Sequence, residues 1–113
     1  MKRMAGIMIG ILLYAGMAAA HAPMKVDLAF EKDTAILSVT FQHKVRNPKD
    51  HFVYLVKVRL NKQEVIEQNL NLQDNENGGS LIYKLNDAKP GDTIEVQIEC
   101  VKGGSRTGKI KIE

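Results

Sequence analysis

Three histidines and one cysteine are the residues of this chain best suited to metal chemistry. They are His21, His43, His51 and Cys100, and no second cysteine occurs in the sequence. Imidazole nitrogens and a thiolate together suit zinc, copper or iron. These four residues are therefore the candidate ligands of a single metal ion, provided that the fold brings them together.

His43 and His51 flank a predicted turn. Asn47-Pro48 is a turn signal, and the apolar alternation of residues 51–60 predicts a strand with one core face. The predicted core face consists of Phe52, Tyr54, Val56, Val58 and Leu60. One histidine would then end a strand and the other would open the next, so the turn could bring both imidazoles to one metal ion.

Cys100 ends a second alternating segment, residues 92–100, in register with its apolar side. A sole cysteine can be a buried thiol, half of an intermolecular disulfide or a metal ligand, and burial is its commonest fate.

The histidines also have a simpler explanation, because isolated histidines in a small domain are mostly surface residues. His21 could simply fray with the chain terminus.

The first 20 residues are predicted to be a secretory signal peptide. Lys2 and Arg3 precede an apolar stretch that is too short for a comfortable membrane span, and Ala18-Ala19-Ala20 supplies the small residues of a cleavage site. Cleavage after Ala20 would leave His21 at the new N-terminus, whereas cleavage after Ala22 would remove it. We expect a periplasmic or secreted domain over residues 21–113, with no membrane association after cleavage.

The mature chain would be nearly neutral. Removing Lys2 and Arg3 from 16 basic residues leaves 14, against 13 acidic residues. The basic residues are spread along the predicted strands rather than gathered in one run, so no nucleic-acid partner is expected.

Seven short alternating segments, separated by polar turns, predict an all-β protein. The predicted strands cover residues 24–30, 34–41, 51–60, 64–70, 81–85, 92–100 and 109–113. Asn61-Lys62 is a predicted tight turn, and residues 71–80 are a polar loop, expected to be the most mobile segment. We predict an immunoglobulin-like antiparallel β-sandwich, with an open barrel as the alternative.

The ordered positions of these residues resemble the iron-binding domain of desulfoferrodoxin and superoxide reductase. His21-Ala22-Pro23 is similar to the His-x-Pro of that family, and His43 with His51-Phe52 is similar to its paired histidines. Lys89-Pro90-Gly91-Asp92 resembles its Lys-Pro-Gly turn, and Cys100 resembles its thiolate ligand. The resemblance covers nearly the whole predicted mature chain.

The resemblance implies an immunoglobulin-like sandwich that holds one ferrous ion by four histidine nitrogens and an axial thiolate. The vacant sixth position takes superoxide, and the thiolate helps the iron to give up an electron and release peroxide. A protein electron donor is then expected. Two positions depart from the pattern. Gly103 occupies the place of the fourth histidine, and Ala19-Ala20 occupies the place of a functional Glu-Lys pair.

Three functions compete at this point. The first is a metal-binding redox domain that uses His21, His43, His51 and Cys100. The second is a copper carrier or sensor, in which the α-amine and ring of an N-terminal His21 chelate the metal. The third is a metal-free interaction module, because residues 91–106 also resemble, more weakly, the end of the Z subunit of the Sox sulfur-carrier complex. No serine lies in a nucleophile-elbow pattern, which argues against a hydrolase.

Overall fold

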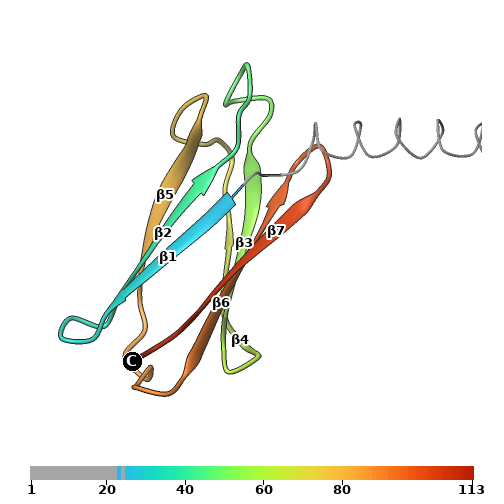
Figure 1. Cartoon of the computed structure of the whole chain (residues 1–113). Coiled ribbons are helices and arrows are strands. Elements are labelled where there is room, and N and C mark those ends of the chain that lie inside the picture. The colour runs from blue at the N-terminus through green and yellow to red at the C-terminus, as the bar shows by residue number, and fades with distance from the viewer. Residues whose placement is uncertain (1–22, 24) are drawn as a thin grey trace, which may run out of the picture.

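The computed structural model describes Pro23 and residues 25–113, and in this range the chain is all-β (Figure 1). The predicted signal peptide, both candidate cleavage sites and His21 lie outside the described residues. The strands are β1 (Lys25–Glu31), β2 (Ile36–Gln42), β3 (Val53–Leu60), β4 (Gln63–Asn69), β5 (Gly78–Lys84), β6 (Thr93–Cys100) and β7 (Ser105–Lys111).

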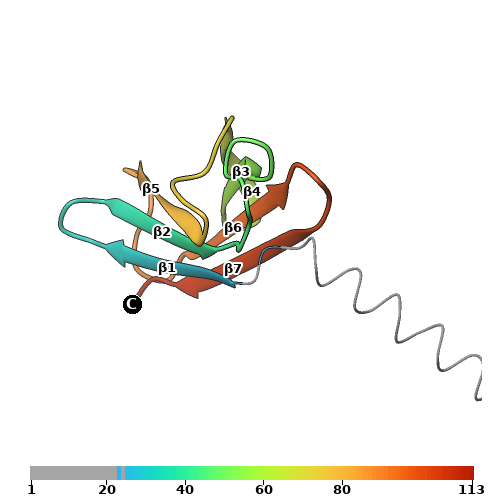
Figure 2. The same cartoon turned by 90° about the horizontal axis from the view of Figure 1, so that it is seen from above.

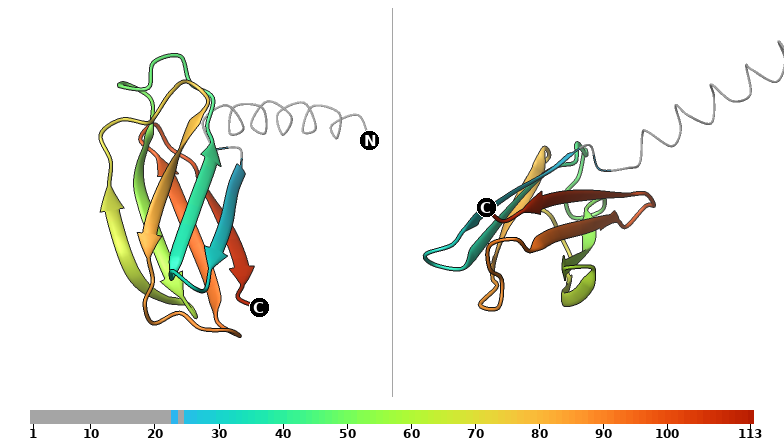
Figure 3. Two further views of the ribbon diagram at one scale, coloured as in Figure 1. Left: turned by 90° about the vertical axis from the view of Figure 1, so that its left-hand side faces the viewer. Right: turned by 60° about the horizontal axis from the view of Figure 1, so that its bottom comes forward.

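The seven strands form two antiparallel sheets, which confirms the predicted sandwich over the open barrel. One sheet has the order β1-β2-β5 and the other has the order β4-β3-β6-β7. The fourth strand pairs with β3, whereas in an immunoglobulin constant domain it joins the opposite sheet. Figure 3 shows the two sheets packed face to face, with strands of similar direction.

The core is built from the inward positions of β2, β3 and β6. β2 and β6 alternate between buried and more exposed residues, as a strand with one wet face should, and β3 does so from Val56 to Arg59. Fully buried side chains from the three strands include Leu37, Val39, Val53, Val56, Val58, Ile94, Val96 and Ile98.

The predicted core face of β3 is wrong at its start. Val53 is fully buried, whereas Tyr54 is only half-buried. The pairing of β3 with β6 shifts register between Val53 and Leu55, and this irregularity changes which parity faces the core. From Val56 onward the predicted parity holds, because Val56 and Val58 are both buried.

Two strand boundaries differ from the prediction by three residues or more. The last strand begins at Ser105 rather than at residue 109, because Arg106 and Thr107 pair with β6 despite their polarity. The predicted polar loop 71–80 is shorter, since β5 begins at Gly78. An added Cβ at Gly78 would lie 2.0 Å from the Phe41 carbonyl oxygen. Only glycine therefore lets β5 approach β2 closely enough to pair with it from residue 78 onward.

One edge of the sandwich is closed by β1 and β7, which lie side by side (Figure 2). An added Cβ at Gly108 would come within 2.8 Å of the Val26 carbonyl oxygen, so the absence of a side chain allows this approach. Arg106 Nε also donates a hydrogen bond of 3.2 Å to the Pro23 carbonyl oxygen. These contacts hold the start of the described chain against the second sheet.

The far end of the sandwich carries structural rather than metal-binding groups. Asn61 and Lys62 both have positive φ, as a two-residue hairpin turn between β3 and β4 requires, which confirms the predicted turn. Asn61 Nδ2 donates to the nearly buried Asp92 carboxylate at 3.0 Å, and the Lys89 backbone N–H donates to the same carboxylate at 3.0 Å.

Candidate metal centre

The three described candidate ligands meet at one end of the sandwich. His43 directly follows β2, His51 lies two residues before β3, and Cys100 is the last residue of β6. Val53 and Cys100 are paired across β3 and β6, which carries His51 towards the cysteine. Figure 1 shows the β2–β3 loop, the β4–β5 loop and the β6–β7 turn at this same end.

Their donor atoms form a compact cluster. His51 Nε2 lies 3.1 Å from Cys100 Sγ, and the rings of His43 and His51 meet edge to face with centroids 4.9 Å apart. One ligand atom from each of the three residues lies within 4.8 Å of the others. His43 and Cys100 are buried and His51 is half-buried, so the cluster has one side towards solvent.

The spacing of the donors fits a metal ion. A histidine nitrogen binds a metal ion such as zinc at about 2.0 Å and a cysteine sulfur binds it at about 2.3 Å. The two donor atoms are then about 3.1 Å apart if the angle at the metal is about 90°, and about 4.3 Å apart if they lie on opposite sides of the metal. The observed 3.1 Å between His51 and Cys100 matches the first value. The 4.8 Å limit of the whole cluster exceeds the second value by only about 0.5 Å. Small side-chain rotations would therefore bring all three donors onto one ion.

His43 is held on both its backbone and its ring. Its backbone N–H donates to the Asn77 carbonyl oxygen at 2.9 Å, and Val45 N–H donates to the Glu76 carbonyl oxygen at 2.9 Å. The ring Nδ1 lies 2.8 Å from Gln73 Oε1. The other ring nitrogen, Nε2, is buried and has no hydrogen-bond partner. It is therefore the His43 nitrogen that remains for a ligand.

Sequence reasoning missed Gln73. It lies in the predicted polar loop, yet its side chain is only 2% exposed and is hydrogen-bonded beneath His43. No periodic signal marks it, because it is surrounded by polar residues and belongs to no strand. The segment expected to be most mobile is therefore anchored in the core at this residue.

Cys100 is a buried thiol with a polar environment on one side. The Lys102 backbone N–H donates to Sγ at 3.4 Å. Burial raises the pKa of the Cys100 thiol, and the backbone N–H groups of Lys102 and Gly103 with the Lys102 charge offset only part of that effect. Since Cys100 is 3% exposed, an intermolecular disulfide would require the turn to open.

A hollow of about 520 Å³ opens next to the cluster and is bordered by His51. Lys44, Arg46 and Lys102 line it, against Asp50 as the one acidic residue. The formal charge of these four groups is therefore +2. Asp50 lies 3.4 Å from Lys102 Nζ in an exposed ion pair, so Lys44 and Arg46 account for the net charge of the hollow.

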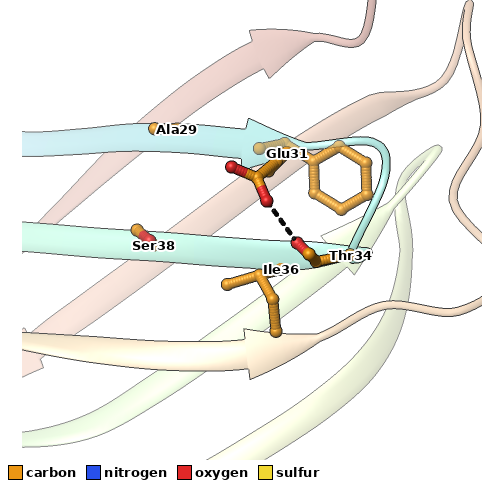
Figure 4. Close-up of a pocket in the computed structure, with 6 residues that line it drawn as sticks. Ala29, Glu31, Thr34, Ile36 and Ser38 are labelled. Atoms are coloured by element: carbon orange, nitrogen blue, oxygen red, sulfur yellow. Dashed lines mark hydrogen bonds between the residues drawn. The ribbon is translucent and has the colours of Figure 1, made fainter.

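A hollow of about 480 Å³ lies over the outer face of β1 and β2, and it has no comparable chemistry (Figure 4). The polar side chains that line it are Glu31, Thr34 and Ser38, and Thr34 Oγ1 already donates to Glu31 Oε1 at 2.9 Å. It contains none of the candidate ligands.

Comparison with models of protein families finds no match, and comparison with curated proteins finds none either. Within the described part of the chain, no helix has the length and apolar character needed to span a bilayer.

Proposed function

We propose that this chain is an exported metal-binding redox protein that holds one iron ion and resembles superoxide reductase. The observation that carries the proposal is the buried, unpartnered Nε2 of His43 in a cluster with His51 and Cys100. A buried polar atom without a partner costs about 1–3 kcal/mol, and native structures contain few of them. A metal ion bound at this nitrogen would remove that cost.

The donor set and its surroundings support redox chemistry on a small anion. When bound, the iron would supply one-electron chemistry, tuned by the Cys100 thiolate and by the hydrogen bond that the thiolate accepts from Lys102 N–H. The cationic hollow beside His51 favours the approach of an anion such as superoxide. Each superoxide needs one electron and two protons to become hydrogen peroxide, so an external protein electron donor is part of the proposal.

His21 is proposed as a further nitrogen ligand. Pro23 is fixed through its carbonyl oxygen by Arg106, which belongs to β7 directly after the Cys100 turn. The proposal requires the two residues before Pro23, which span about 7 Å when extended, to carry His21 to this end of the sandwich. Cleavage after Ala20 would keep this ligand in the exported protein.

Copper is the second candidate metal. The described donors are two imidazoles and one thiolate, which is the trigonal set of blue-copper electron-transfer sites. A copper protein of this kind would exchange electrons with a partner without binding a substrate.

Elemental analysis of the exported protein, purified from its native source together with its N-terminal mass, tests the proposal. About one iron per chain with His21 retained is the expected result. About one copper per chain, with an intense thiolate-to-copper absorption, would show that the bound metal is copper rather than iron. A metal-free protein with a reduced Cys100 would overturn both and favour the interaction module.

A further inference from the structure

We infer that Gln73 is a positioning residue of the metal centre, which fixes the tautomer of His43 so that Nε2 is the ligand nitrogen. The inference rests on the proposed metal binding. It adds a residue that is neither a ligand nor part of any strand.

The orientation of the Gln73 amide is determined by its neighbours. Its Nε2 donates to two carbonyl oxygens, of His43 at 2.8 Å and of Asn75 at 3.0 Å. Its Oε1 accepts from the Val53 backbone N–H at 3.3 Å. A flipped amide would place its oxygen against two carbonyl oxygens and its NH₂ group against an N–H donor. The observed orientation is therefore the one that satisfies all three groups.

The fixed amide in turn determines the proton on His43. Gln73 Oε1 can only accept, so the Nδ1 atom at 2.8 Å must carry the hydrogen. In the neutral ring Nε2 then has a lone pair and no proton, which is the form that binds a metal ion. Metal-bound histidines commonly donate their second N–H to a carbonyl or carboxylate in this way.

The same side chain joins the ligand to the scaffold. Gln73 contacts the ring and backbone of His43, the loop carbonyl of Asn75 and the first residue of β3. A buried amide with these four hydrogen bonds limits rotation of the imidazole. The His43 side chain then loses its conformational freedom when the protein folds rather than when the metal binds. Metal binding therefore costs less entropy, and the metal affinity is higher.

Nitrogen-detected NMR of the metal-free protein gives the direct test, because the two tautomers have distinct Nδ1 and Nε2 shifts. The expected result is a proton on Nδ1 of His43. Gln73→Met removes all four hydrogen bonds at similar length, and it should mix the tautomers and lower cobalt(II) affinity by about 10–100-fold. Gln73→Glu keeps an acceptor for Nδ1–H but cannot donate to the two carbonyl oxygens, so it should retain the tautomer and lower the affinity less than Gln73→Met does.

Leu72→Ala is the matched control, because Leu72 is the 49% exposed neighbour of Gln73 in the same loop and its side chain cannot form a hydrogen bond. It should change neither the tautomer nor the cobalt affinity. A proton on Nε2 in the native chain would overturn the inference, as would unchanged affinity in a folded Gln73→Met variant. If the tautomer is as expected but the native chain binds no metal, the proposed function fails and the positioning role fails with it.

Discussion

His51 Nε2 lies 3.1 Å from Cys100 Sγ, although the two residues are 49 positions apart in the sequence. The pairing of β3 with β6 brings them together, since Val53 is the partner of Cys100. The pair therefore depends on the global fold rather than on a local motif. It also contains the one sulfur among the candidate ligands, which gives it a distinct spectroscopic signature.

Cys100→Ser should abolish tight metal binding. A hydroxyl is a poor replacement for a thiolate, and we expect cobalt(II) affinity to fall by more than about 100-fold, beyond the usual effect of changing a supporting group. The sulfur-to-cobalt absorption band should disappear as well. Val101→Ala is the control, because this neighbour is 44% exposed and offers no ligand atom. Unchanged metal content in a folded Cys100→Ser protein would remove the cysteine from the site.

The cations of the hollow should accelerate reaction with superoxide. Lys44→Gln combined with Arg46→Gln is expected to lower the bimolecular rate by about tenfold at low salt and to weaken its dependence on ionic strength. The rate can be followed by pulse radiolysis of the reduced, metal-loaded protein. Lys49→Gln serves as the control, since Lys49 is exposed in the same loop but does not line the hollow. Equal rates in the double variant and the control would contradict the proposed approach of the anion.

Asp92 should contribute to the acid sensitivity of the fold. The hydrogen bond from Asn61 and the backbone N–H of Lys89 lower the pKa of Asp92 below its usual 3.8. Because the folded pKa is depressed, this stabilisation is present above the unfolded value and is lost as pH falls through the folded one. Melting temperatures measured from pH 7 to pH 2 should therefore decline below about pH 4.

Asn61→Ala should weaken that dependence. Without the strongest donor, the pKa of Asp92 moves back towards the unfolded value, so the variant is less stable at pH 7 and loses less on acidification. Asp27→Asn is a suitable comparison, because Asp27 forms only an exposed ion pair with Lys25 at 3.6 Å. If Asn61→Ala and native proteins lost stability in parallel on acidification, the hydrogen bond would not be the cause.

Tyr83 should make the fold sensitive to alkali. Its hydroxyl donates to Gln68 Oε1 at 2.6 Å and so connects β5 with β4 of the other sheet. Burial raises the pKa of Tyr83 from 10.0 to about 12. Between these values the folded protein holds the proton more tightly than the unfolded chain, so stability falls as pH rises. Tyr83→Phe should cost about 0.5–1.5 kcal/mol at pH 7 and flatten that decline in denaturant titrations.

The sequence predicts most of the fold because period-two alternation is a strong signal wherever one strand face is buried. The segments around Leu37, Val56 and Ile94 alternate cleanly, and each becomes a core strand. The start of β3 is different, since the register shift after Val53 follows from pairing with β6, which local sequence does not encode. The polar start of β7 is likewise decided by its partner strand.

The candidate site could be predicted less completely. His43, His51 and Cys100 were recognisable as rare ligand types near strand ends, and the structure brings them together. Gln73 was not recognisable, because a glutamine in a polar loop has no pattern that distinguishes burial from exposure. The cationic hollow depends on Lys102 meeting the β2–β3 loop, a contact between distant segments that composition does not reveal.

Gly103 offers a test of the resemblance itself, because it occupies the place of the family's fourth histidine. It has a φ of +110°, and an added Cβ would meet nothing within 4 Å, so a side chain has space there but strains the backbone. Gly103→His and Gly103→Ala should both lose about 1–2 kcal/mol of stability from that strain. If the position is a ligand position, Gly103→His alone should bind cobalt(II) at least about tenfold more tightly than Gly103→Ala, a gain of about 1.4 kcal/mol. Equal affinities in the two variants would show that position 103 does not face the metal centre.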